Sequence, residues 1–380
     1  MHLIEKLYIE NFKLIEENIF KFSRFNILIG PNGSGKSSVI HALAYIKIMA
    51  RIGSEPRVPY EFPDLLFLRN ISNREKSLKI EIHGKYLITF EELKGTFAEY
   101  IVRIVDMSFS GEILGVVLMD GKYVKEFPIK IGGKLLSRRS SSILEYVLKP
   151  GSSRIINIYA PIGRISFVPV LRGMVAIASQ PAISLGYGYT NILGMIASDY
   201  VIRQKIGELA SQILGYKVSL DLRFIRRGWA LENLAYGIPI NMAQEAFGIS
   251  QLLYLLLFLL MTPEGGAVCI EEPEIHLHPA SQARLVEKLV EVAKQRNLQL
   301  IITTHSEHIL LKFLNLVAKN TITNEDLKVY YFERDEKKPV ARVEELEVTE
   351  KGELIGGLKG FFEHEVDEFE EYIKARTSRR

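Results

Sequence analysis

Short apolar stretches predict buried strands at three places in the chain, residues 25–29, 267–271 and 299–304. Each stretch is too short for a buried helix and ends in glycine or polar residues, which is typical of a strand inside a sheet. Segments with helical spacing of apolar residues follow each of them, and Pro279 is expected to open one of these helices with His278 as its cap. This alternation predicts a mostly parallel sheet flanked by helices. The predicted helices cover 37–49, 279–296 and 305–319, and a further strand covers 328–333.

Alternation of apolar and polar residues predicts antiparallel strands elsewhere. Residues 3–9 and 15–22 alternate in this way and predict a hairpin at the edge of the sheet. Residues 192–214 predict a helix, two or three strands follow in 217–242, and residues 252–261 predict a buried apolar helix. Further strands, separated by glycine and polar turns, predict an antiparallel β-rich insertion at 78–92, 100–108, 113–119 and 123–131.

Composition limits the class of protein. With 380 residues, 47% of them hydrophobic, the chain can bury a large core and is expected to fold as two lobes. Its single cysteine, Cys269, lies in a predicted buried strand, so no disulfide forms within the chain and a reducing compartment fits. The charged N-terminal residues are unlike a secretory signal, and the longest apolar run is far shorter than the roughly 20 residues of a membrane helix. We therefore expect a cytoplasmic protein without membrane insertion.

The strongest chemical signal is the loop after the first predicted strand. It matches the pattern G-x-x-x-x-G-K-[ST] and lies between a strand and a helix, as a phosphate-binding loop requires. Its glycines let backbone N–H groups close around phosphates at the positive end of the helix. We expect Lys36 to reach the β- and γ-phosphates of a bound nucleoside triphosphate and Ser37 to ligate Mg²⁺. The residues expected to bind the nucleotide are Gly30, Pro31, Asn32, Gly33, Ser34, Gly35, Lys36, Ser37 and Ser38.

Polar side chains that end the other two apolar strands are candidates for catalysis. We assign Glu271 to Mg²⁺ and Glu272 to the attacking water, because an acid beside a phosphate loop can hold the metal and its neighbour can accept a proton. A solvated strand end is the other interpretation, and the apolar strand in front of the acids argues against it. His305 can hydrogen-bond the γ-phosphate and the water, or serve as a core histidine. The carboxyl ends of parallel strands meet at one crevice, which favours catalysis.

Five segments stand in a characteristic order along the chain: Asn11-Phe12-Lys13, the loop 30–38, Phe247-Gly248-Ile249-Ser250-Gln251, the acidic segment 271–279, and Thr304-His305-Ser306. In this order they resemble the motifs of ABC-type ATPases of the SMC-like and OLD-like branch. They are similar above all to poorly characterised AAA/ABC-like ATPases with GxSQ and IEEPEIHLHP motifs. The resemblance covers residues 1–50 and 240–335, while the middle of the chain matches only as a variable insertion.

The resemblance implies a homodimer with two ATP molecules sandwiched between its subunits, each touched by the signature loop of the opposite subunit. Gly248 and Ser250 are the candidates for this contact. The serine is fourth in the signature, whereas ABC transporters have it second, so no single atom is assigned. Lys13 matches a basic position that approaches the nucleotide in SMC-like relatives, and an exposed basic residue explains it equally well. Arg172 lies where relatives link the nucleotide to the insertion and is a candidate sensor of the γ-phosphate.

The expected fold class is α/β, a P-loop NTPase of the ABC-ATPase type with a central mostly parallel sheet flanked by helices, an antiparallel β insertion and a helical lid. We expect residues 1–55 and 240–335 to form the ATPase core. Residues 56–175 are assigned to the β-rich insertion, and 176–239 to a helical lid segment that leads to the signature. Residues 336–380 are expected to add a strand, an acidic helix and a basic tail.

Charge is unevenly distributed although the net charge is only +3. Residues 122–172 hold ten lysines and arginines against two glutamates, a composition that can follow a nucleic-acid backbone. A solvated loop or a docking face for an acidic partner is the alternative.

These observations together predict an ATP-hydrolysing, Mg²⁺-dependent dimer that acts on DNA, in DNA repair or defence, or with an effector protein. The alternative is an ATP-switched module that gates a separate nuclease or effector with little turnover. A transporter ATPase subunit is a third interpretation, and the altered signature argues against it.

Overall fold

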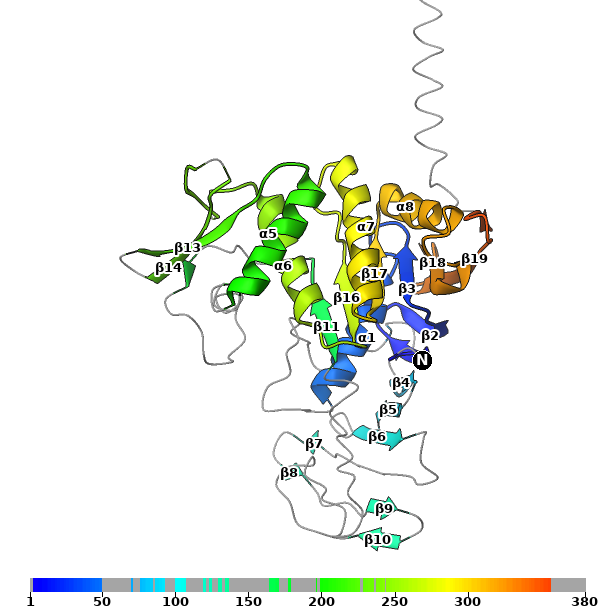
Figure 1. Cartoon of the computed structure of the whole chain (residues 1–380). Coiled ribbons are helices and arrows are strands. Elements are labelled where there is room, and N and C mark those ends of the chain that lie inside the picture. Colours follow the sequence, from blue (N-terminus) through cyan, green and yellow to red (C-terminus); the bar gives the residue numbers. More distant parts are fainter. Residues whose placement is uncertain are drawn as a thin grey trace, which may run out of the picture.

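In the computed structural model, a seven-stranded sheet runs through the centre of the molecule (Figure 1). Across the sheet the strands are β11 (Ile165–Val168), β16 (Ala267–Glu271), β17 (Gln299–Thr304), β3 (Phe25–Ile29), β18 (Leu327–Arg334), β19 (Ala341–Val348) and β20 (Leu354–Ile355). The first five are parallel, and the last two continue the sheet in antiparallel register. The structure describes residues 3–49, 70, 76–84, 86–92, 100–106, 119–120, 123–124, 129–131, 134–136, 164–170, 177–178, 196, 199–225, 228–235, 237–242 and 244–356.

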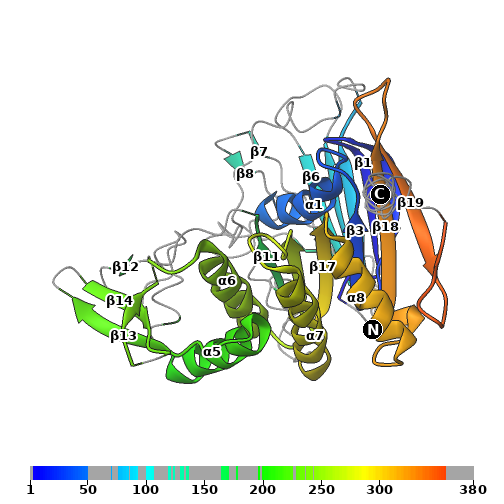
Figure 2. The same cartoon turned by 90° about the horizontal axis from the view of Figure 1, so that it is seen from above.

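Helices cover both faces of this sheet (Figure 2). One face carries α1 (Lys36–Met49), which follows β3 directly. A short 3₁₀ turn, η2 (Asn324–Asp326), leads into β18. None of the helices in the described part of the chain combines the length and apolar character that crossing a membrane needs. The other face carries α5 (Tyr200–Leu214), α6 (Phe247–Met261), α7 (Pro279–Gln295) and α8 (Glu307–Ala318).

The central strands are buried on both faces because helices cover both sides of the sheet. Successive side chains of a strand point to opposite sides, so neighbouring residues enter different cores. Ile27 and Ile29 join the core that lies under α5 to α8, whereas Leu28 joins the core under α1. In the same way, Ile302 faces the first core and Ile301 the second. The mainly apolar stretches at 25–29 and 267–270 therefore reflect burial between two separate cores.

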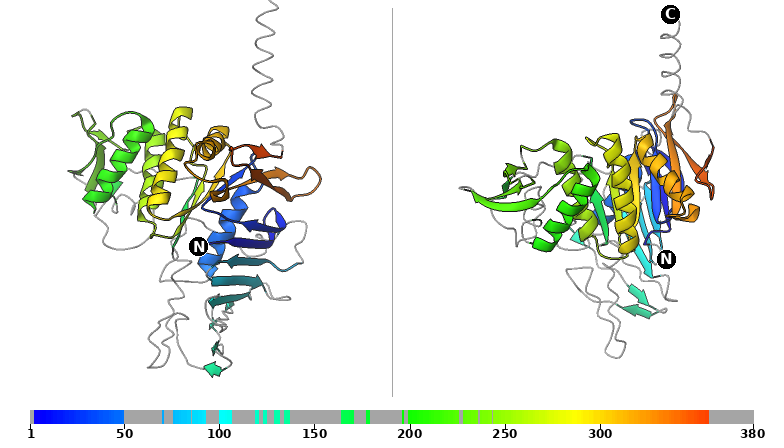
Figure 3. Two further views of the ribbon diagram at one scale, coloured as in Figure 1. Left: turned by 45° about the vertical axis from the view of Figure 1, so that its right-hand side comes forward. Right: turned by 45° about the horizontal axis from the view of Figure 1, so that its top comes forward.

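A second sheet packs beside α1 and is antiparallel throughout. Its β1–β2 hairpin confirms the predicted hairpin, but the hairpin belongs to this sheet and not to the edge of the parallel one. Strands from the predicted insertion pair onto β1, so the insertion extends a sheet that starts at residue 6. Figure 3 shows these blue and cyan strands next to the blue helix α1. The strands in order are β2 (Ile15–Lys21), β1 (Lys6–Phe12), β4 (Lys79–His83), β5 (Tyr86–Glu92) and β6 (Tyr100–Asp106).

Smaller sheets complete the described fold. One of them forms a lobe beyond α5, at the opposite end of the molecule from β18 and β19 (Figure 1). It confirms the two or three strands predicted in 217–242. Its strands are β12 (Ile177–Ala178), β13 (Leu220–Ile225), β14 (Gly228–Asn233) and β15 (Ile240–Asn241). Two short pairs remain, β7 (Met119–Asp120) with β8 (Tyr123–Val124) and β9 (Ile129–Ile131) with β10 (Lys134–Leu136).

The predicted fold class and the three central strands are confirmed, and so are Pro279 as the first residue of α7 and His278 as its cap. The range assigned to the insertion also contains one strand of the central sheet. β11 lies inside the range 56–175 but pairs with β16 in the parallel sheet, since its short apolar run needs burial on both faces. β19, within 336–380, likewise extends the core sheet. The predicted acidic helix lies outside the described residues.

Candidate nucleotide site

The loop 30–38 leaves the centre of the sheet and enters α1. Gly30, Gly33 and Gly35 have φ angles of 153°, 72° and 103°, conformations that favour glycine. Backbone hydrogen bonds from Ser34 N to the Pro31 carbonyl and from Ser38 N to the Gly35 carbonyl close its turns. The first N–H groups of a helix lack partners within that helix, so this loop presents donors to an anion.

The β18–β19 hairpin packs against this loop from the side. A Cβ atom at Gly30 would lie 2.1 Å from the carbonyl oxygen of Phe332 in β18. A Cβ atom at Gly35 would lie 3.1 Å from the Cβ of Ala341 in β19. The glycines are therefore needed for close packing as well as for their backbone angles, because the hairpin leaves no room for a side chain at Gly30.

Lys36, in the first turn of α1, is buried and points back into the loop. Its Nζ donates to the carbonyl oxygens of Gly30 and Pro31, each at 2.8 Å, and lies 3.3 Å from Nδ1 of His305. Burial lowers the pKa of Lys36 to about 8, against the opposing effect of the negative charges of Glu272 and Glu274. Among the described residues Lys36 forms no ion pair, and a bound phosphate would supply a close charge partner for this buried ammonium.

The predicted catalytic residues form one chain of contacts, Lys36 to His305 to Glu272. Nε2 of His305 lies 3.0 Å from Oε1 of Glu272. Because a lysine ammonium can only donate, Nδ1 of His305 must accept from Lys36, and Nε2 then carries the proton given to Glu272. The structure thus brings together side chains from α1, from the end of β17 and from the end of β16.

Glu272 itself has an unusual backbone, with φ 44°. Non-glycine residues rarely adopt this left-handed conformation, and such strain concentrates at functional sites. The Glu272 N–H donates to the carbonyl oxygen of Thr303 at 2.8 Å, so the end of β17 holds the strained residue in place. The conformation turns the chain sharply after Glu271, so that the two neighbouring acids serve different contacts.

A second chain of contacts has the same order of residue types as the first, lysine to histidine to glutamate, and it contains a residue that the sequence analysis missed. Nζ of Lys13 lies 2.6 Å from Nδ1 of His41, and Nε2 of His41 lies 3.4 Å from Oε1 of Glu271. Burial, with the charge of Lys13, lowers the pKa of His41 to about 3, so this imidazole is neutral at pH 7. Burial also lowers the pKa of Lys13 to about 8. His41 lies on α1 outside any recognised motif, and only its place beside Glu271 reveals it.

The residues present fit Mg²⁺ and the phosphates of ATP. Glu271 is buried at the end of β16, and Ser37 follows Lys36 in the first turn of α1, so both predicted metal ligands are hard oxygen donors of the kind Mg²⁺ prefers. The hydroxyl groups of Ser34 and Thr303 are buried without a hydrogen-bond partner among the described residues. Buried polar groups without partners are costly unless a ligand or water satisfies them.

The signature segment, residues 247–251, lies at the start of α6 and takes no part in the two contact chains that contain Glu271 and Glu272. Gly248 packs against the segment after the acids, since a Cβ there would lie 2.5 Å from the carbonyl oxygen of His276. Ser250 is only 3% exposed, whereas Phe247 is 41% exposed and meets the His276 ring edge-to-face at 4.9 Å. The contact of Gly248 and Ser250 with a partner's nucleotide stays a prediction. Arg172, and the basic segment 122–172 apart from 164–170 and a few strand residues, lie outside the described residues.

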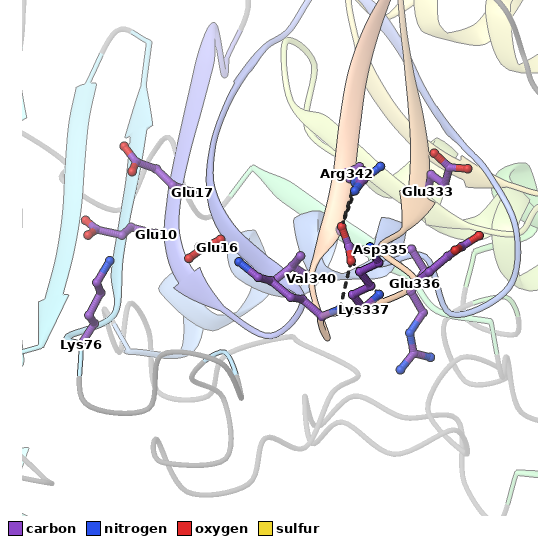
Figure 4. A pocket seen from close by; sticks show the side chains of 13 residues that line it. Glu10, Glu16, Glu17, Lys76, Glu333, Asp335, Glu336, Lys337, Val340 and Arg342 are labelled. Atoms are coloured by element: carbon purple, nitrogen blue, oxygen red, sulfur yellow. Dashed lines mark hydrogen bonds and ion pairs between the residues drawn. The ribbon is translucent and has the colours of Figure 1, made fainter.

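A charged recess of about 830 Å³ lies between the β1–β2 hairpin and the β18–β19 hairpin (Figure 4). The guanidinium of Arg334 lines it, and a Cβ at Gly33 would lie 3.8 Å from that group, so the recess adjoins the phosphate loop. Asp335 pairs with Arg342 at 2.6 Å inside it. Its lining carries both signs of charge: Glu10, Glu16, Glu17, Lys76, Glu333, Arg334, Asp335, Glu336, Lys337, Lys338 and Arg342, with Val340 and Ala341.

Comparison with known proteins identifies the family. The model of the AAA ATPase domain matches residues 3–145 and 187–310, more than half of the chain. The chain belongs to the AAA ATPase domain family. A curated relative, the OLD nuclease of Thermus scotoductus, is 22% identical over 334 residues, which cover 80% of this chain and 59% of that protein. The chain therefore spans less than two thirds of the length of this relative.

Solved structures of SMC heads share the fold of this AAA ATPase domain protein. An SMC head bound to the C-winged helix domain of ScpA gives a TM-score of 0.51 at 16% identity, over 90% of this chain and 97% of that one. A second, with an extended coiled coil and bound to the C-terminal domain of ScpA from Pyrococcus furiosus, gives 0.52 at 13% identity, over 90% and 96%. The family, the relative and this fold confirm the resemblance to SMC-like and OLD-like P-loop ATPases.

Proposed function

We propose that this chain binds ATP with Mg²⁺, hydrolyses it, and forms a homodimer when ATP is bound. The observation that carries the proposal is the contact chain from Lys36 through His305 to Glu272. Membership of an ATPase family supports nucleotide binding in general, and this chain of contacts supplies specific residues for hydrolysis. Ser37 and Glu271 would hold Mg²⁺, which when bound neutralises charge on the phosphates.

The reaction we propose is attack of water on the γ-phosphorus of ATP. Lys36 would exchange its contacts with the loop carbonyls for phosphate oxygens, where its charge is best compensated. The water oxygen bonds to phosphorus, the bond from phosphorus to the bridging β–γ oxygen breaks, and ADP leaves. Glu272 accepts the proton of the water, and His305 holds the Glu272 carboxylate through Nε2.

We propose DNA, or a protein that acts on DNA, as the partner of this ATPase. The name of the relative in Thermus scotoductus, a nuclease, supports DNA, and the domains of ScpA bound to SMC heads support a protein partner. Lysines and arginines in 122–172 supply charge for contact with phosphates of a nucleic-acid backbone. Contacts of this kind would make binding steeply dependent on salt and weakly dependent on base sequence.

Phosphate release from Mg-ATP, measured with and without duplex DNA, tests the proposal. Wild-type protein should turn over ATP, and Glu272→Gln should keep ATP but lose turnover, since an amide fits the same space and accepts no proton. Glu287→Ala, a change of an exposed glutamate on α7, is the control and should leave the rate unaltered. Nucleotide binding without turnover in the wild type would favour the ATP-switched module that gates a separate effector.

A further inference from the structure

We propose that Glu274 is the positioning residue of this site: its carboxylate fixes the turn at 304–306 and thereby aims His305 at Glu272. This inference rests on the proposed hydrolysis for its catalytic consequence. Glu274 lies two residues after Glu272, in the segment that leads from β16 to α7. It makes no hydrogen bond to Lys36, although its charge acts on that lysine, and its hydrogen bonds all go to the turn that carries His305.

One oxygen of Glu274 collects three hydrogen bonds from the turn that carries His305. Oε1 accepts from the Thr304 hydroxyl at 2.6 Å, from the His305 backbone N–H at 2.8 Å and from the Ser306 backbone N–H at 3.2 Å. Hydrogen bonds to a charged acceptor are stronger and shorter than neutral ones. Three donors converging on one atom fix both the position and the direction of the turn.

The environment of Glu274 is unusual for a residue with only a structural role. Its other oxygen, Oε2, is buried and has no hydrogen-bond partner among the described residues. Burial raises the pKa of Glu274, although the hydrogen bonds from Thr304 and His305 oppose this effect. A carboxylate costs free energy when buried, and an apolar residue would fill the same space without that cost. The acidic side chain therefore lies where its hydrogen bonds order the neighbouring turn that carries His305.

A further contact ties the same turn to α7. The Ser306 hydroxyl donates to Oε1 of Gln282 at 2.6 Å, and Nε2 of Gln282 donates to the Leu277 carbonyl at 2.9 Å. Ser306 also caps α8 through its contact with the Ile309 N–H. The residues on both sides of His305, Thr304 and Ser306, are thus held by hydrogen bonds. Within the described residues, Glu274 is the only carboxylate that accepts from the His305 backbone N–H.

The test combines single and double variants in the full chain. Glu274→Ala should lower kcat for ATP hydrolysis by about tenfold or more without weakening ATP binding, because it removes no nucleotide contact and takes a negative charge away from Lys36. Glu274→Gln, which keeps an acceptor oxygen, should recover part of the rate. In a His305→Ala background, Glu274→Ala should have no further effect on kcat, since Glu274 acts through His305. Glu232→Ala removes another buried glutamate, far from this turn, and is the control.

Amide hydrogen exchange supplies a readout that does not depend on turnover. In Glu274→Ala, the N–H groups of His305 and Ser306 should exchange about tenfold faster or more than in the wild type. If the alanine variant does not fold, Thr304→Val removes one of the three donors and carries both measurements, with exchange followed at the His305 N–H, because the Thr304 hydroxyl also accepts from the Ser306 N–H at 2.9 Å. Unchanged exchange, or additive effects with His305→Ala, overturns the inference. A wild type without ATP turnover refutes the proposed function, and exchange alone then decides the role of Glu274.

Discussion

At the scale of single residues, Lys36 uses all three of its donors within the protein. Two carbonyl oxygens and one imidazole nitrogen occupy them. In the proposed mechanism, ATP binding would replace these contacts and would free Nδ1 of His305. Phosphate binding at the proposed site would therefore remove the Lys36 contact from His305 before any bond of ATP is broken.

Lys36→Ala should lower ATP affinity by at least about tenfold, or about 1.4 kcal/mol, because a compact cation at the β- and γ-phosphates is lost. Calorimetry with Mg-ATP measures the change. Lys312→Ala, on α8 and paired with Glu287, is the control and should bind ATP as the wild type does. A folded Lys36→Ala protein with unaltered affinity would remove the loop 30–38 from the nucleotide site.

Sequence alone predicted Lys36, Glu272 and His305, because each follows a buried strand whose pattern is recognisable. It did not predict His41 or the contacts of Glu274. His41 belongs to no sequence motif on its helix. Its proposed role depends on its contact with Glu271, which lies on a strand far away in the sequence. Contacts between side chains of different elements require the packed structure.

At the scale of elements, the β18–β19 hairpin packs against one side of the loop 30–38 and supports it. Gly30→Ala should therefore displace the hairpin, since its Cβ would lie 2.1 Å from the Phe332 carbonyl oxygen at a φ of 153°. We expect a loss of about 2 kcal/mol or more in stability together with weaker ATP binding. Thermal unfolding and calorimetry measure the two effects.

Gly237→Ala is the matched control for this substitution. Gly237 also has a positive φ, 76°, but among the described residues, its chain neighbours aside, no atom lies within 4 Å of the position that an alanine Cβ would take there. It should cost only the backbone strain, about 1 kcal/mol, and should leave ATP affinity unaltered. Equal effects of the two variants would show that the hairpin does not support the loop.

The elements themselves were predicted unevenly. β3, β16 and β17 were predicted to within a residue, since each is a short, mainly apolar run that ends in glycine or polar residues and is too short for a buried helix. The pairing of β4 onto β1 was not predicted, because alternation shows that a strand has one buried face but not which strand lies beside it. The membership of β11 in the parallel sheet was missed for the same reason.

Cys269 provides a test of the central sheet. It is buried in β16, and burial raises the pKa of its thiol, so the reactive thiolate is scarce in the folded protein. A thiol reagent such as Ellman's should fail to react in native buffer and should titrate one thiol per chain in denaturant. Fast reaction in native buffer would contradict the burial of β16.

At the scale of the whole molecule, the proposed dimer gives a prediction about mass. In Glu272→Gln with Mg-ATP, light scattering should report twice the 43.2 kDa of one chain, and without nucleotide it should report one chain. The Gly248 segment and the phosphate loop would come from opposite subunits. A protein that binds ATP and stays monomeric at micromolar concentration would contradict the sandwich arrangement.

The pairing of β3 with β18 has a consequence for synthesis on the ribosome. Phe25 and Leu327 are partners, and the other neighbour of β3, β17, begins at Gln299. At about 5–20 residues per second, the roughly 270 residues between β3 and β17 take about 14–54 s, during which both edges of β3 lack their partner strands. A nascent chain halted before Leu327 already contains the phosphate loop, both acids and His305, yet it lacks the hairpin that supports the loop. ATP retention by stalled chains would thus mark the moment at which translation has passed β19.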